Sequence, residues 1–161
     1  MNNVCYLQYC GSMYKIELVN LGLVTLHPNA FLGLGSLREL DLSRNNLTVL
    51  PEELFQWLGS ITHLKLSENR LGQGSNIDQL VSGFAQLENL ELAVNQLTAV
   101  PDLTSCSALV SIDLSYNKIL TLPGVEDRGS GPIGVLSGLD RLENLNLQKN
   151  QIQSVSGDFF R

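Results

Sequence analysis

The stretch that decides the fold is LRELDLSRNNL at residues 37–47, because the same phrase returns four more times along the chain. The other copies are ITHLKLSENRL at 61–71, LENLELAVNQL at 87–97, LVSIDLSYNKI at 109–119 and LENLNLQKNQI at 142–152. All of them read L-x-x-L-x-L-x-x-N-x-L, with the asparagine at Asn45, Asn69, Asn95, Asn117 and Asn150. Successive asparagines are 24, 26, 22 and 33 residues apart. A phrase that returns at such a period is typical of a stacked repeat protein.

A weaker copy precedes the five, and it starts at Met13 and keeps its apolar positions at Ile16, Leu18 and Leu23 while Leu21 replaces the asparagine. A terminal repeat has a neighbour on one side only, so loss of the consensus is expected there. We therefore predict one domain over residues 1–161, with residues 1–12 as a partial repeat or cap. The six repeats are expected to start near residues 13, 37, 61, 87, 109 and 142.

Each phrase predicts a short strand followed by a bend. In the second repeat Leu40 and Leu42 alternate with Asp41, which is the pattern of a strand with one buried face. The asparagine follows at a bend, where backbone groups turn inward without strand partners. Its amide can both donate and accept, so it can satisfy them. We expect the strands of successive coils to pair as a parallel sheet.

Between the strands, the return legs repeat a second pattern in which a proline is followed by Phe or Leu, as in Pro51 with Leu54 and Phe55. Proline favours an extended turn, and the larger side chain fills the far side of the coil. The last interval is longer because residues 123–141 contain an insertion rich in Gly and Pro at 123–134. A binding loop and a tolerated insertion both fit that composition.

These motifs resemble the leucine-rich-repeat superfamily, and residues 28–71 look like its typical 24-residue class. The resemblance implies an α/β solenoid: a right-handed horseshoe with a parallel β-sheet on the concave face and irregular or short helical segments on the convex side. It also implies that ligands usually bind the concave face. This class is common in extracellular receptors and matrix proteins, yet Cys5 and Cys10 lack the partners of a cysteine-rich cap.

Composition excludes several other roles. The net charge of −6, with ten Lys and Arg in all, argues against a nucleic-acid partner. No apolar stretch is long enough to insert into a membrane. The N-terminus has no visible secretory signal, which favours the cytoplasm for the chain as given, whereas the repeat class favours an extracellular protein of which it is a fragment. The last coil ends without a cap, so we also expect stacking or oligomerisation through uncapped ends.

The outward side chains of the strands are the ones free to specify a partner. We predict a partner-binding set on the concave face, with Tyr116 beside Val94 as the aromatic anchor because Tyr and Arg are frequent in binding hot spots. His63, Lys65 and Glu91 could form a polar cluster. The whole set is Arg44, His63, Lys65, Glu91, Val94, Asp113, Tyr116 and Lys149.

No catalytic, cofactor or metal-binding motif is present. His27 and His63 belong to different repeats, and neither a phosphate-binding glycine loop nor an H-E-x-x-H motif occurs. We therefore predict a protein–protein interaction module that is not an enzyme, with no cofactor and no metal. Two alternatives stay open: a structural spacer within a larger extracellular protein, and a regulatory subunit of an enzyme.

Overall fold

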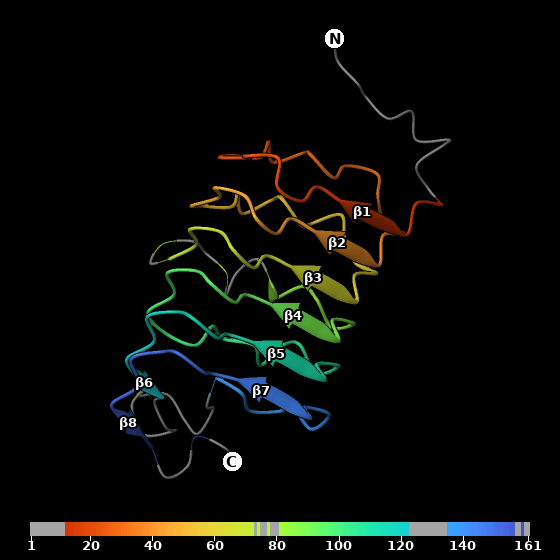
Figure 1. The fold of residues 1–161 in the computed structure, drawn as a ribbon. Helices are drawn as coiled ribbons and strands as arrows, with labels where there is room; N and C mark the ends of the chain where they lie inside the picture. The colour runs from red at the N-terminus through yellow and green to blue at the C-terminus, as the bar shows by residue number, and fades with distance from the viewer. Residues whose placement is uncertain are drawn as a thin grey trace.

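A computed structural model of the chain describes residues 12–72, 74, 77, 81–122, 135–156 and 159. It is a stack of coils in which each coil adds one strand to a common sheet (Figure 1). The six strands of this sheet follow the order of the sequence: β1 (Lys15–Glu17), β2 (Glu39–Asp41), β3 (His63–Lys65), β4 (Asn89–Glu91), β5 (Ser111–Asp113) and β7 (Asn144–Asn146).

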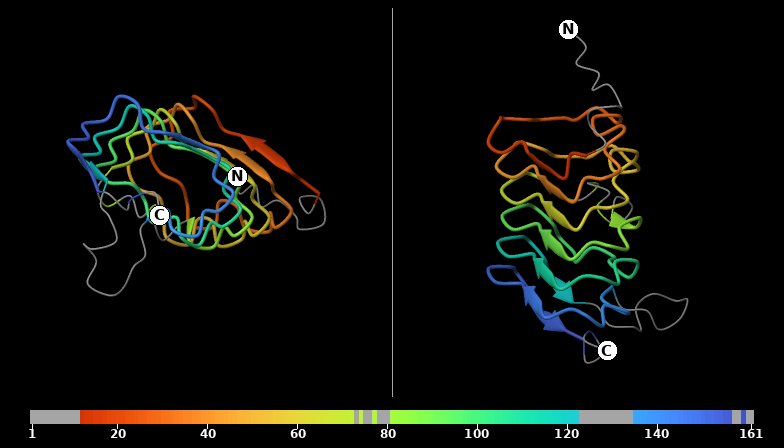
Figure 2. Two further views of the ribbon diagram at one scale, coloured as in Figure 1. Left: turned by 90° about the horizontal axis from the view of Figure 1, so that it is seen from below. Right: turned by 90° about the vertical axis from the view of Figure 1, so that its right-hand side faces the viewer.

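All neighbouring strands of this sheet pair in parallel, and each starts two residues after the predicted start of its repeat. The register pairs equivalent positions, so that Leu40 lies between Ile16 and Leu64. Figure 2 shows the strands along one wall of the stack and the return legs along the other. The predicted parallel-sheet solenoid is therefore confirmed.

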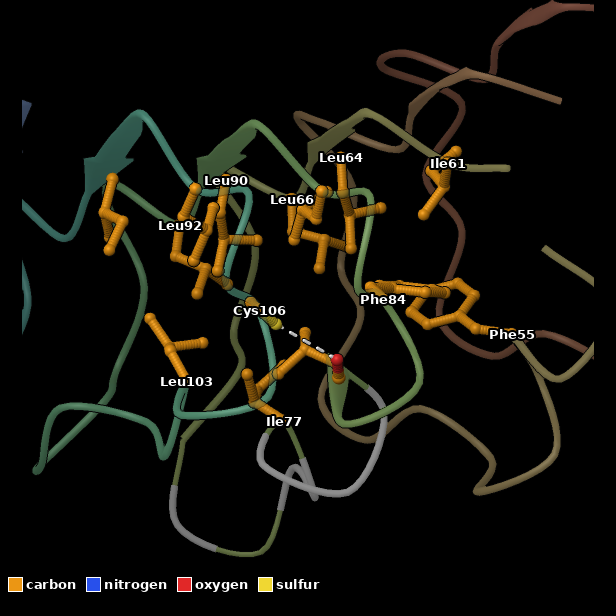
Figure 3. Close-up of a cluster of buried hydrophobic side chains, with 14 of the residues drawn as sticks. Phe55, Ile61, Leu64, Leu66, Ile77, Phe84, Leu90, Leu92, Leu103 and Cys106 are labelled. Carbon is orange, nitrogen blue, oxygen red and sulfur yellow. Dashed lines mark hydrogen bonds between the residues drawn. The ribbon is translucent and has the colours of Figure 1, made fainter. Parts of the chain in front are cut away.

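The core is the apolar spine inside the stacked coils (Figure 3). Leu42, Leu66, Leu92 and Leu114 are fully buried, because each has a coil on either side. The end strands differ, since Ile16 in β1 and Leu145 in β7 are only half-buried. Repeat proteins gain stability from contacts between neighbouring repeats, so the middle coils contribute most of this burial.

The return legs are built mainly of turns, and Ile77 and Val81 are helical. Three phenylalanines from successive legs pack against one another: the rings of Phe31 and Phe55 are stacked with centroids 6.3 Å apart, and those of Phe55 and Phe84 are tilted with centroids 5.7 Å apart. Aromatic rings at such distances gain about 0.5–1.5 kcal/mol beyond their burial. The legs are therefore irregular but well packed.

A second, two-stranded sheet pairs β6 (Thr121–Leu122) with β8 (Ser154–Val155) in parallel. The repeat pattern did not predict it, because these residues lie beyond the L-x-L segment. The predicted insertion at 123–134 and the predicted N-terminal cap, apart from Ser12, lie outside the described residues.

Candidate functional site

A row of asparagine side chains fixes the edge of the sheet. In each middle coil the amide nitrogen donates to a carbonyl of its own coil and to one of the preceding coil, as Asn95 Nδ2 does to Leu92 O at 3.1 Å and to Leu66 O at 3.0 Å. Its Oδ1 accepts from Leu71 N at 3.0 Å. Asn45, Asn69, Asn117 and Asn150 make the equivalent bonds. The five asparagines therefore link every coil to its predecessor.

The residue before each asparagine adopts the left-handed backbone conformation, and so does Asn20 in the first coil. These φ values lie between 53° and 59° for Asn20, Arg44, Glu68, Val94, Tyr116 and Lys149. The amide of each such residue bonds the next coil where one is described, as Val94 N does to Ser115 O at 2.9 Å. The side chains of Val94 and Tyr116, 47% and 55% exposed, therefore stand out in adjacent coils at the end of the strands.

The outward strand positions form two columns across the concave face. The strand register aligns Lys15, Glu39, His63, Asn89, Ser111 and Asn144 in the first column and Glu17, Asp41, Lys65, Glu91, Asp113 and Asn146 in the second. Neighbouring strands lie about 4.8 Å apart, so side chains in one column reach each other directly.

Both lysines in these columns form ion pairs. Lys15 Nζ lies 3.0 Å from Glu17 Oε1 and 3.5 Å from Glu39 Oε2, and Lys65 Nζ lies 3.0 Å from Glu91 Oε1. The hydrogen bond to Glu17 raises the pKa of Lys15 above its ordinary value, and the hydrogen bond to Glu91 does the same to the pKa of Lys65. The positive charges of these two columns are therefore already neutralised by the chain itself.

His63 is held by a separate set of bonds. Thr62 Oγ1 donates to Arg38 O at 3.1 Å and lies 2.9 Å from His63 Nδ1, while Asn89 Nδ2 lies 2.9 Å from His63 Nε2. Since the hydroxyl proton is used on Arg38, a neutral ring would carry its proton on Nδ1 and accept from Asn89. His63 and Lys65 therefore bond different partners, Asn89 and Glu91, although they lie on the same strand.

The predicted partner-binding residues fall into two rows. One row lies on the strands and contains His63, Lys65, Glu91 and Asp113. The other, which we call the left-handed row, consists of the residues with positive φ and contains Arg44, Val94, Tyr116 and Lys149. The predicted set left out Glu68, whose Oε1 lies 2.9 Å from Arg44 Nε in the neighbouring coil. It also left out Asp41, which lines a hollow of about 140 Å³ over β1–β3 together with Lys15, Ile16, Glu17, Glu39, Leu40, His63 and Lys65. Their shared position in the repeat was the available signal.

Elsewhere, the described part of the chain offers little reactive chemistry. Cys106 is buried, its Sγ donates to Val81 O at 3.2 Å (Figure 3), and burial raises the pKa of its thiol. Within the described ranges, no three His, Cys, Asp or Glu side chains gather where they could hold a metal ion. None of the helical segments described is long and apolar enough to cross a membrane.

Comparison with known proteins agrees with this architecture. Residues 12–71 match the family model described as leucine rich repeat. The crystal structure of a TLR13–ssRNA13 complex superposes with a TM-score of 0.80, at 26% identity over 93% of this chain. The chain is a leucine-rich-repeat protein. Such repeats are typically non-catalytic and commonly bind proteins, although TLR13 is in complex with an RNA in that crystal structure.

Two further relatives differ in how much of their length the chain spans. The complex of BIR3 with SERK2 from Arabidopsis thaliana has a TM-score of 0.62 at 27% identity, covering 89% of this chain and 69% of that one. Protein NUD1 of Saccharomyces cerevisiae is 34% identical over 76 residues, which are 47% of this chain and 8% of the yeast protein. The chain also spans only 20% of the TLR13 chain. It therefore corresponds to a small part of most of these proteins.

Proposed function

We propose that this leucine-rich-repeat protein is a non-catalytic protein-binding module and that the partner contacts the concave face. The observation that carries the proposal is the side-by-side exposure of Val94 and Tyr116, which stand out from consecutive coils next to the polar columns of the sheet. Exposed aromatic side chains beside polar groups are frequent in the energetic centres of protein interfaces.

Charge favours a protein over RNA as the partner. The two columns carry the carboxylates of Glu17, Glu39, Asp41, Glu91 and Asp113, against the two lysines Lys15 and Lys65. A phosphate backbone would be repelled by such a face, because nucleic-acid binding depends on clustered Lys and Arg. The related structures span both possibilities, since one is a complex with RNA and another is a complex of two proteins.

The experiment is affinity capture with the full chain, followed by a measured dissociation constant for each recombinant candidate partner. Tyr116→Ala removes the exposed aromatic ring, and Lys65→Glu reverses a charge in the middle of the second column. Trp57→Ala is the matched control, because Trp57 is 42% exposed and belongs to the return leg between β2 and β3.

A partner that uses the concave face should bind Tyr116→Ala about tenfold more weakly or worse, the loss expected for a hot-spot residue. Binding to Trp57→Ala should stay within about twofold. A structural spacer would have no partner whose affinity depends on Tyr116 or Lys65. An affinity that neither concave-face variant changes would therefore count against the proposal.

A further inference from the structure

The carboxylates on the concave face differ in whether they form ion pairs. In the second column Lys65 and Glu91 form their own pair, and Glu17 is paired with Lys15. Asp41 and Asp113 are different, because neither has a Lys or Arg partner within ion-pair distance among the residues that the structure describes. These two carboxylates lie on β2 and β5, on either side of the Lys65–Glu91 pair.

Both carboxylates are held in a fixed orientation by their own backbone. Asp41 Oδ1 accepts from Ser43 N at 2.9 Å, and Asp113 Oδ1 accepts from Ser115 N at 2.9 Å. One oxygen of each carboxylate is thereby engaged, and neither carboxylate belongs to an ion pair among the described residues, although the charge of Lys65 acts on Asp41 from the neighbouring strand. A group that is already oriented loses less conformational freedom on binding, so such carboxylates are well suited to receive a cation.

We infer that the concave face takes an extended, basic segment of a protein partner, with one cationic side chain at Asp41 and another at Asp113. The inference rests on the proposed function and adds the chemistry of the partner. Lys65 of the chain itself shows that a cationic side chain can bond a carboxylate of this column, because it lies beside Asp41 and its ammonium group bonds Glu91. Val94 and Tyr116 lie in the coils of β4 and β5, where they can cover the aliphatic stem of the cation at Asp113.

The spacing of the two carboxylates sets the spacing of the cations. Three strand intervals separate β2 from β5, which is about 14 Å at about 4.8 Å for each interval. An extended segment rises about 3.4 Å per residue, and its alternate side chains share a face. Two basic residues four positions apart would therefore span the distance and point to the same side.

The test uses three synthetic nonapeptides of threonine, serine and glycine. The first carries two lysines four positions apart, the second is its isomer with the two lysines adjacent, and the third has glutamates in place of the spaced lysines. Binding is followed by amide chemical shifts of the labelled full chain. The amides of Ser43 and Ser115 are direct reporters, because they bond the two carboxylates.

The spaced-lysine peptide should shift both reporter amides, bind more tightly than its isomer, and weaken as salt is added, because exposed charges are screened. The glutamate peptide should shift neither. The double variant Asp41→Asn and Asp113→Asn should bind the spaced-lysine peptide about fivefold more weakly, as expected for two exposed ion pairs. It should still fold, because Asn146 occupies the equivalent position and its Oδ1 accepts from Gln148 N at 3.1 Å.

The control is Glu52→Gln with Glu53→Gln, which removes the same charge from exposed positions on a return leg and should leave binding unchanged. Equal affinity for the two lysine isomers, or full binding by the double asparagine variant, would overturn the inference. A natural partner that depends on Tyr116 but binds the double asparagine variant normally, with no salt dependence, would overturn the inference while the proposed function stands.

Discussion

Val94 and Tyr116 occupy equivalent positions in adjacent coils, and both have a left-handed backbone, with φ of 53° and 54°. The repeat imposes this conformation wherever the chain leaves the strand, whatever residue the sequence supplies. The energetic cost of this conformation differs between residues: among those other than glycine, Asn tolerates it well and a β-branched residue poorly. Asn20 stands in the same position in the first coil, so the chain itself supplies the lower-cost residue.

We predict that Val94→Asn raises the free energy of unfolding by about 1 kcal/mol, because it relieves a β-branched side chain at positive φ. Denaturant unfolding of the full chain measures the change. Val49→Asn is the control, since Val49 is 49% exposed and has no positive φ. An equal gain in both variants would show that exposure of an apolar side chain, and not backbone strain, is responsible.

Removing one asparagine of the row should change the free energy of unfolding far more, and in the opposite direction. Asn117→Ala leaves Leu92 O, Leu114 O and Leu97 N without this partner, which lies 2.9, 3.0 and 3.0 Å away. We expect a loss of about 3 to 4 kcal/mol, because an unpaired buried polar group costs about 1–3 kcal/mol. Asn144→Ala, on the exposed end of β7, should cost less than about 0.5 kcal/mol. Similar losses for the two variants would contradict the role given to the row.

Cys106 should react slowly with alkylating agents in the folded chain. Burial raises the pKa of its thiol, and the thiolate is the reactive form. Mass mapping of the Cys106 peptide after brief alkylation at mildly alkaline pH should find little modification in the folded state and rapid modification in denaturant. Stability supplied by the protonated thiol is complete below the pKa of the unfolded thiol and is lost as pH rises through the higher folded pKa. Equal alkylation in both states would show that the coil around Cys106 opens freely.

Much of this architecture follows directly from the sequence. The L-x-L spacing predicts the strands, because alternation and burial are local properties. The equivalent places of Leu40, Leu64 and Leu90 within their repeats predict the parallel register. The asparagine row follows for the same reason. The two outward columns of the concave face could therefore be written down before the structure.

The features that the sequence did not predict depend on contacts that the repeat pattern does not encode. Arg44, Val94 and Tyr116 have no common preference for positive φ, so residue propensities gave no sign of the left-handed row. Whether His63 pairs with Lys65 or with Asn89 depends on side-chain rotamers, and the structure pairs it with Asn89. The β6–β8 sheet joins equivalent positions of the last two coils, 33 residues apart as in the β5–β7 pair, but these positions lie beyond the L-x-L segment from which the strands were predicted.

The most direct test of the central claim is hydroxyl-radical footprinting of the full chain with a bound partner. Tyr116 and Trp57 are both exposed aromatic residues, at 55% and 42%, but Tyr116 follows β5 of the concave sheet, whereas Trp57 belongs to the return leg between β2 and β3. Contact on the concave face predicts that the partner lowers oxidation of Tyr116 several-fold and leaves that of Trp57 unchanged. Protection of Trp57 with continued oxidation of Tyr116 would contradict it.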